Sequence, residues 1–132
     1  MADGGSVAPA LSLRRSAQSG AKVMTAAWQV VFTDNTTTSA IAFLFGSAEI
    51  DLSNMQAGDT INLRVRKTLT PTGAWVLHDQ MAYAGAQPVT HPSAHIGGLL
   101  NVYGVEISMQ QTAGVLRSID TDFYLAKRWG LN

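Results

Sequence analysis

The three histidines are the residues of this chain whose type and spacing come closest to a reactive site. His91 and His95 are four positions apart in HPSAH, a spacing that presents two metal ligands on one face of a helix. Pro92 and the neighbouring glycines argue against a helix, and no glutamate follows His91 as a metalloprotease motif would require. We therefore expect no metal ion and no cofactor at these residues.

The aspartates offer no better catalytic pair. Asp51 and Asp59 bracket a polar loop, where aspartate usually accepts hydrogen bonds from backbone N–H groups. Asp79 falls on the apolar face of its predicted strand, so either the strand bends there or the carboxylate is paired, with Arg117 as the candidate partner. Cysteine, a G-x-S-x-G nucleophile motif and a phosphate-binding GxxxxGK loop are all missing from the sequence. We therefore predict that the protein is not an enzyme.

The elements that must position these residues have the two-residue period of β-strands. In the segment 26–34, for example, Ala26, Trp28, Val30 and Phe32 are predicted to share the inward face. Six segments alternate in this way: 26–34, 39–46, 59–69, 75–83, 101–110 and 119–125. Short polar turns separate most of them, and the segment 85–101 is irregular. The chain is therefore predicted to form an all-β domain, an antiparallel β-sandwich or jelly-roll-like barrel.

Two glycine-containing turns, TPTG at 70–73 and QTAG at 111–114, are predicted to close hairpins. Inward residues must lie opposite inward residues, and a plain four-residue loop after residue 69 would shift the first hairpin out of that register. The conflict disappears if Gly73 adopts a left-handed conformation in a β-bulge, and Gly114 can do the same. Replacing Gly73 by valine is then expected to cost stability.

The N-terminal segment differs from the rest. Residues 1–22 are rich in Gly, Ala and Ser and carry Arg14, Arg15 and Lys22 against one acidic residue, Asp3. This composition cannot bury enough apolar surface to fold alone. We predict an extended arm over 1–22, which is either a disordered tail or a segment that lies on another chain, and a β-sandwich domain over 23–132.

Charge limits the classes of partner. Nine Lys and Arg balance nine Asp and Glu, which gives no reason to expect free nucleic acid or an anionic membrane as the main partner. Only 14% of residues are charged, so part of the surface is expected to be covered by neighbouring proteins. The candidate partner-binding residues are Arg14, Arg15, Lys22, Arg64, Arg66 and His78.

The basic residues lack the aromatic companions of an RNA-binding sheet. Such a sheet places aromatic side chains among the basic ones on its exposed face, whereas Trp28 and Trp75 follow the inward pattern here. Arg64 and Arg66 therefore indicate either a docking surface for protein or a solvated sheet face. No run of about 18 apolar residues and no signal peptide are present. We therefore expect a chain that does not associate with a membrane and is not exported by the usual route.

Three segments resemble small all-β virion proteins of tailed bacteriophages: DLSNMQAGDTINLRVRKTL at 51–69, WVLHDQMAYAGAQ at 75–87 and VEISMQQTAGVLRSIDTDFYL at 105–125. The resemblance implies a capsid decoration or cement protein that is made in the host cytoplasm and binds the major capsid protein on the outside of the head as a homotrimer. One alternative is a carbohydrate- or receptor-binding β-module of a tail or fibre, which should expose aromatic residues in the loop 84–100, where few are present. A second alternative is an intracellular β-domain of unrelated function.

Overall fold

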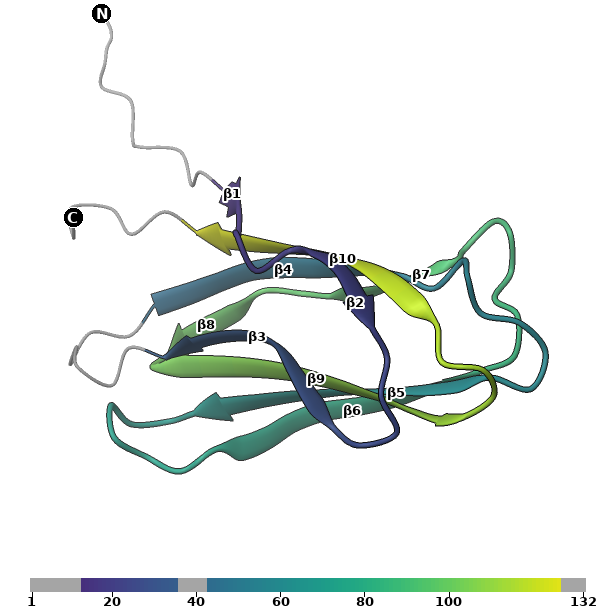
Figure 1. Cartoon of the computed structure of the whole chain (residues 1–132). Coiled ribbons are helices and arrows are strands. Elements are labelled where there is room, and N and C mark those ends of the chain that lie inside the picture. The colour runs from purple at the N-terminus through teal and green to yellow at the C-terminus, as the bar shows by residue number, and fades with distance from the viewer. Residues whose placement is uncertain (1–12, 36–42, 127–132) are drawn as a thin grey trace, which may run out of the picture.

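The computed structural model describes residues 13–35 and 43–126, which form ten β-strands and no helix. The strands make two antiparallel sheets packed face to face, so the all-β sandwich predicted from the sequence is confirmed (Figure 1). No helix in the described residues is long and apolar enough to cross a lipid bilayer.

The six-stranded sheet is centred on two long strands, β4 and β10. The paired strands β10 and β4 are flanked on the β10 side by β1 and β2 and on the β4 side by β7 and β8. The bounds are β1 Leu13–Arg15, β2 Gly20–Val23, β4 Phe43–Asp51, β7 Ser93–Ile96, β8 Leu99–Val102 and β10 Ser118–Ala126.

The four-stranded sheet has the order β3-β9-β5-β6. Its strands are β3 Gln29–Asn35, β5 Thr60–Thr68, β6 Val76–Ala84 and β9 Gly104–Ala113. β5 alternates buried apolar residues with more exposed polar ones over most of its length, which is the pattern of a strand with one face on the core. β6 is an edge strand, and most of its residues are exposed.

The strand pairing is nested around the β5–β6 hairpin. β5 pairs with β6, β4 with β7 and β8, β3 with β9, and β2 with β10, as in one long hairpin wrapped into two sheets. This double-sheet arrangement is a jelly roll. The predicted hairpin between the last two strands is therefore wrong: β9 and β10 are consecutive in the chain but lie in opposite sheets.

Three phenylalanines join the two sheets at the centre of the core. Phe32 of β3 lies 4.9 Å from Phe123 of β10 and 5.4 Å from Phe45 of β4, measured between ring centroids, and all three side chains are fully buried. Tilted aromatic pairs at these distances add to the free energy gained by burial. The sheets are therefore held together by direct contacts between residues far apart in sequence.

The register of the β5–β6 hairpin is set by a bulge within β6 and not by a bulge at the turn, where it was predicted. Val65 lies opposite Asp79, but Arg66 lies opposite Leu77, so His78 is an extra residue that forms a bulge in β6. Gly73 does not have positive φ; it ends an ordinary turn in which its N–H donates to the Thr70 carbonyl at 3.1 Å. The predicted Gly73 bulge is wrong because the register shift lies within β6 and not at the turn.

The same bulge changes which residues face the core. Leu77, predicted inward, is 55% exposed and lies opposite Arg66, whereas Asp79 lies opposite the buried Val65. Of the two explanations offered for Asp79, the bend of the strand is the one observed. Arg117 pairs with another carboxylate.

The N-terminal segment is part of the sandwich wherever the structure describes it. β1 and β2 pair with β10, with Arg15 opposite Tyr124 and Lys22 opposite Ile119. Residues 13–22 therefore extend the six-stranded sheet of their own chain, in contrast to the predicted arm lying on another chain. The rest of the predicted arm, residues 1–12, lies outside the described residues.

Candidate functional site

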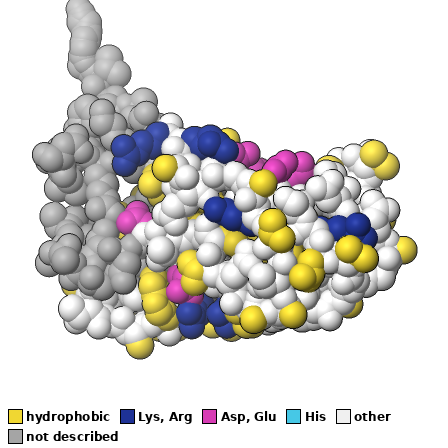
Figure 2. All heavy atoms as spheres, viewed as in Figure 1, with side chains coloured by type: hydrophobic (Ala, Val, Ile, Leu, Met, Phe, Trp, Pro, Cys, Tyr) yellow, Lys and Arg dark blue, Asp and Glu magenta, His cyan; other side chains and the backbone are white. Residues whose placement is uncertain are grey.

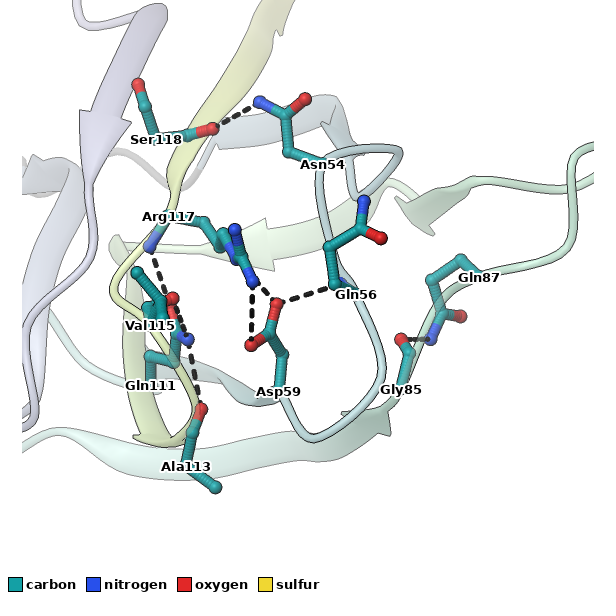
Figure 3. Close-up of polar contacts among 10 residues, drawn as sticks. All are labelled: Asn54, Gln56, Asp59, Gly85, Gln87, Gln111, Ala113, Val115, Arg117 and Ser118. Carbon is teal, nitrogen blue, oxygen red and sulfur yellow. Dashed lines mark hydrogen bonds and ion pairs between the residues drawn. The ribbon is translucent and has the colours of Figure 1, made fainter.

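The most extensive polar network among the described residues centres on Asp59, immediately before β5, and Arg117, immediately before β10 (Figure 3). Arg117 Nε donates to Asp59 Oδ2 at 2.7 Å and its Nη2 donates to Oδ1 at 3.3 Å. The Asp59 side chain is 1% exposed and that of Arg117 is 25% exposed. The hydrogen bond from Arg117, followed by that from the Gln56 backbone N–H, lowers the pKa of Asp59 below that of an ordinary aspartate.

The turn between β9 and β10 is fixed against this ion pair. The Gln111 side-chain amide donates to the carbonyls of Ala113 and Val115, and its oxygen accepts from the Arg117 N–H at 2.9 Å. Gly114 has a φ of +86°, and a Cβ there would collide with the Asp59 side chain and approach Asp59 Cα to 2.8 Å. The left-handed conformation predicted for Gly114 is confirmed. Gly114 lies, however, in a connection from one sheet to the other and not in the turn of a hairpin.

Two further loops are tied to the same residues. The Gly85 N–H, at the end of β6, donates to the Asp59 carbonyl at 2.8 Å. Asn54 in the β4–β5 loop donates through its side chain to the Ser118 carbonyl at 2.8 Å. The loops 52–59, 85–92 and 114–117 thus form one connected surface at the right of Figure 1, which we call the loop end.

The loop end presents apolar side chains to solvent. Val89 is 96% exposed, Val115 is 69% exposed and Leu116 is 51% exposed. Hydrophobic atoms, coloured yellow, protrude at this right-hand end in Figure 2. Exposed apolar groups on loops fixed by hydrogen bonds and an ion pair suit contact with another protein, because little conformational freedom is lost on binding.

The predicted partner-binding residues do not gather in one patch. Arg14, Arg15 and Lys22 lie on the short strands beside β10, Arg64 and Arg66 lie on the outer face of the four-stranded sheet, and His78 lies at the β6 bulge. Figure 2 likewise shows the dark blue Lys and Arg side chains as separate groups.

Two of these basic residues pair with carboxylates. Arg15 Nε donates to Asp122 at 2.7 Å with both side chains exposed. Arg66 Nε donates to Glu106 of β9 at 2.8 Å, and the Glu106 side chain is 10% exposed. Two of the five Lys and Arg residues among the candidates are therefore already paired with a carboxylate of the same chain.

Arg64 has an aromatic companion that the sequence pattern missed. Its guanidinium carbon lies 4.3 Å from the centroid of the Trp28 ring, a cation–π contact. Trp28 lies outside β3, so the expectation that it follows the inward alternation of that strand is wrong. Val30 is also exposed, because the register between β3 and β9 shifts between Val30 and Phe32.

The histidines are dispersed among separate surroundings. His95 Nδ1 lies 2.9 Å from Glu49 Oε1, and both side chains are about half exposed. His91 lies in the β6–β7 loop and is exposed, and His78 is exposed at the bulge. Within residues 13–35 and 43–126, no group of three His, Cys, Asp or Glu residues is arranged to hold a metal ion.

Comparison with known proteins finds likeness only at the level of structure. No protein-family model matches the chain, and no curated protein matches its sequence. Among solved structures the chain is similar to PirA, with 14% identity, a TM-score of 0.54, and coverage of 84% of this chain and 96% of PirA.

The chain is also similar to VP2 in the subviral particle of infectious bursal disease virus. That match has 13% identity and a TM-score of 0.52, and it covers 89% of this chain but 32% of the VP2 chain. What is shared is the fold. The chain therefore has an architecture that a viral capsid-related protein also uses, and its function must be inferred from its own surfaces.

Proposed function

We propose that this protein is a virion structural protein, a decoration or cement protein that binds the assembled head of a tailed bacteriophage and stabilises it through protein–protein contacts. The observation that carries the proposal is the loop end, where the Asp59–Arg117 pair and backbone hydrogen bonds join three loops, two of which present exposed apolar side chains. The similarity of the jelly roll to a segment of VP2 supports the same role.

The loop end suits repeated weak binding to a particle. A patch containing Val89, Val115 and Leu116 is small, so one copy should bind the major capsid protein weakly. A homotrimer, which the proposal includes, would engage three sites of a symmetric particle at once and gain avidity without further contacts. Arg14 and Lys22, which pair with no carboxylate among the described residues, would add attraction to an acidic capsid surface.

Co-sedimentation with assembled heads tests the proposal. The wild-type protein should pellet with heads of the virus that encodes it and should not bind free capsid subunits. Val115→Asp combined with Val89→Asp should weaken binding at least tenfold, because two charges would be placed in the apolar contact. Leu69→Asp is the matched control, because Leu69 is 58% exposed but lies in the β5–β6 turn at the opposite end of the sandwich (Figure 1).

Two further measurements separate this role from the alternative. Sedimentation equilibrium should give a trimer, and deletion of residues 1–12 should weaken head binding while leaving β1 and β2 in place. A monodisperse monomer without affinity for any particle would overturn the proposal. Binding to a glycan array, unaffected by the loop-end substitutions, would instead favour a receptor-binding module.

A further inference from the structure

A pocket opens at the side of the sandwich, and none of its lining residues belongs to the loops 52–59, 85–92 and 114–117. It lies between the edge strand β6 of one sheet and the β7–β8 turn of the other, and its volume is about 130 Å³. Pockets for drug-sized ligands measure roughly 300–1,000 Å³, so this one suits a single side chain of a partner better than a free organic ligand.

Apolar residues of both sheets form part of the pocket wall, beside the polar residues His78, Asp79 and His95. Val65, Ile96 and Leu99 are buried residues of the core, and Met81 is partly buried beside them. Gly97 and Gly98 line the pocket with backbone alone, because they have no side chains. These walls favour a ligand with an aliphatic portion several carbons long.

One carboxylate, that of the exposed residue Asp79, lines the pocket beside these apolar side chains. Asp79 follows the bulge residue His78, lies opposite Val65 and lines the pocket. Its Oδ1 accepts the Gln80 N–H at 2.8 Å, and no Lys or Arg of the described residues forms an ion pair with it. Burial raises the pKa of the Tyr83 phenol, and the negative charge of Asp79 raises it further.

These features indicate which chemical group of a partner molecule would fit the pocket. A carboxylate without an ion-pair partner attracts a cation, and the apolar side chains beside it accept a methylene chain, so the matching group is an alkylammonium. Arginine fits less well, because its guanidinium binds best to two free carboxylate oxygens and one oxygen of Asp79 is already engaged. The lysine ammonium is a compact charge whose N–H groups can donate to the one remaining oxygen of Asp79.

We propose that this pocket binds the side chain of a lysine presented by a partner protein, with the ammonium group on Asp79 and the methylene chain against Val65 and Leu99. The site is separate from the loop end, and it would bind such a lysine whether or not the partner is a capsid protein. It gives the protein a second point of attachment, on the seam between the two sheets.

Backbone amide NMR on the full chain tests the proposal with small probes. Nα-acetyl-lysine methylamide should shift the amide signals of Gly97, Gly98 and His78. Its dissociation constant should be at least tenfold lower than that of Nα-acetyl-norleucine methylamide, which lacks the ammonium group. Nα-acetyl-arginine methylamide should bind more weakly than the lysine probe.

The substitution Asp79→Asn should weaken lysine binding at least tenfold, and Asp79→Glu should retain part of it. Asp120→Asn is the matched control, because Asp120 is an exposed carboxylate on β10 in the other sheet. Unchanged thermal unfolding of each variant shows that the fold is intact. Equal binding of the lysine and norleucine probes, or unaltered lysine binding by Asp79→Asn, overturns the proposal. The proposal is also overturned if monosaccharides shift the amide signals of Gly97, Gly98 and His78 and the lysine probe does not.

These measurements use the isolated protein and do not involve virus particles. A failure of the lysine site therefore leaves the capsid proposal standing, and a failure to bind heads leaves the lysine site standing.

Discussion

Arg117 donates to Asp59 across 58 positions of sequence, and its Nε lies 2.7 Å from Asp59 Oδ2. The contact joins the start of β10 in one sheet to the start of β5 in the other, so it closes one end of the sandwich. Because Asp59 is almost completely buried, its carboxylate depends on Arg117 and on backbone N–H groups for compensation.

Breaking this pair should destabilise the protein. Asp59→Ala leaves the Arg117 guanidinium without its carboxylate, and we expect the thermal unfolding midpoint to fall by several degrees. Calorimetry on Asp59→Ala, Arg117→Ala and the double variant should give a clear coupling between the two sites. The control is Arg15→Ala, which removes an exposed ion pair with Asp122 and should cost no more than about 1 kcal/mol.

The same carboxylate predicts a pH dependence. The pKa of Asp59 in the folded state is lowered from 3.8, so the folded protein holds its proton less tightly than the unfolded chain does. The stabilisation from Asp59 is therefore complete above pH 3.8 and is lost as the pH falls through the lower, folded-state value. Urea unfolding between pH 2 and 7 should show a smaller acid loss in Asp59→Asn than in the wild type, and parallel curves would contradict the prediction.

The two turn glycines should respond differently to substitution. Gly114→Ala should cost roughly 2 kcal/mol or more, because φ is +86° and the new Cβ would collide with Asp59. Gly73→Ala should cost less, because Gly73 has no positive φ and its close neighbour is the Thr70 hydroxyl, which can rotate away. Denaturant unfolding of the two variants measures both values, and equal losses would contradict this account.

The Trp28–Arg64 contact should contribute modestly to stability. The guanidinium lies 4.3 Å from the ring centroid, and a cation–π contact of this kind is worth about 0.5–2 kcal/mol. A double-mutant cycle with Trp28→Leu and Arg64→Met should recover a coupling energy in this range. The same cycle with Arg66→Met in place of Arg64→Met should give almost none, because Arg66 pairs with Glu106 instead.

The aromatic contacts that join the two sheets should contribute strongly to the free energy of unfolding. Phe32→Ala should destabilise the protein by about 3–5 kcal/mol, because it removes the ring that contacts both Phe45 and Phe123. Val30→Ala, two residues earlier on an exposed position of β3, should cost much less. Thermal unfolding of the two variants under identical conditions checks the difference.

The sequence by itself determined the class of fold and the identity of many core residues. Alternation in 59–69 correctly placed Ile61, Leu63 and Val65 inside, because a strand with one buried face must repeat every two residues. The left-handed backbone conformation of Gly114 could also be predicted from the sequence, since glycine tolerates positive φ. Both features depend only on local geometry.

Only the tertiary structure decided which strands pair and where the alternation breaks. The nested pairing sends β9 and β10 to opposite sheets, and the bulge at His78 exposes Leu77 and directs Asp79 toward the pocket. Alternation within a strand carries no information about its neighbour, and an extra residue in a bulge reverses every face beyond it. For the same reason the pairing of Arg117 with Asp59 depends on packing between distant segments and could not be predicted from local sequence.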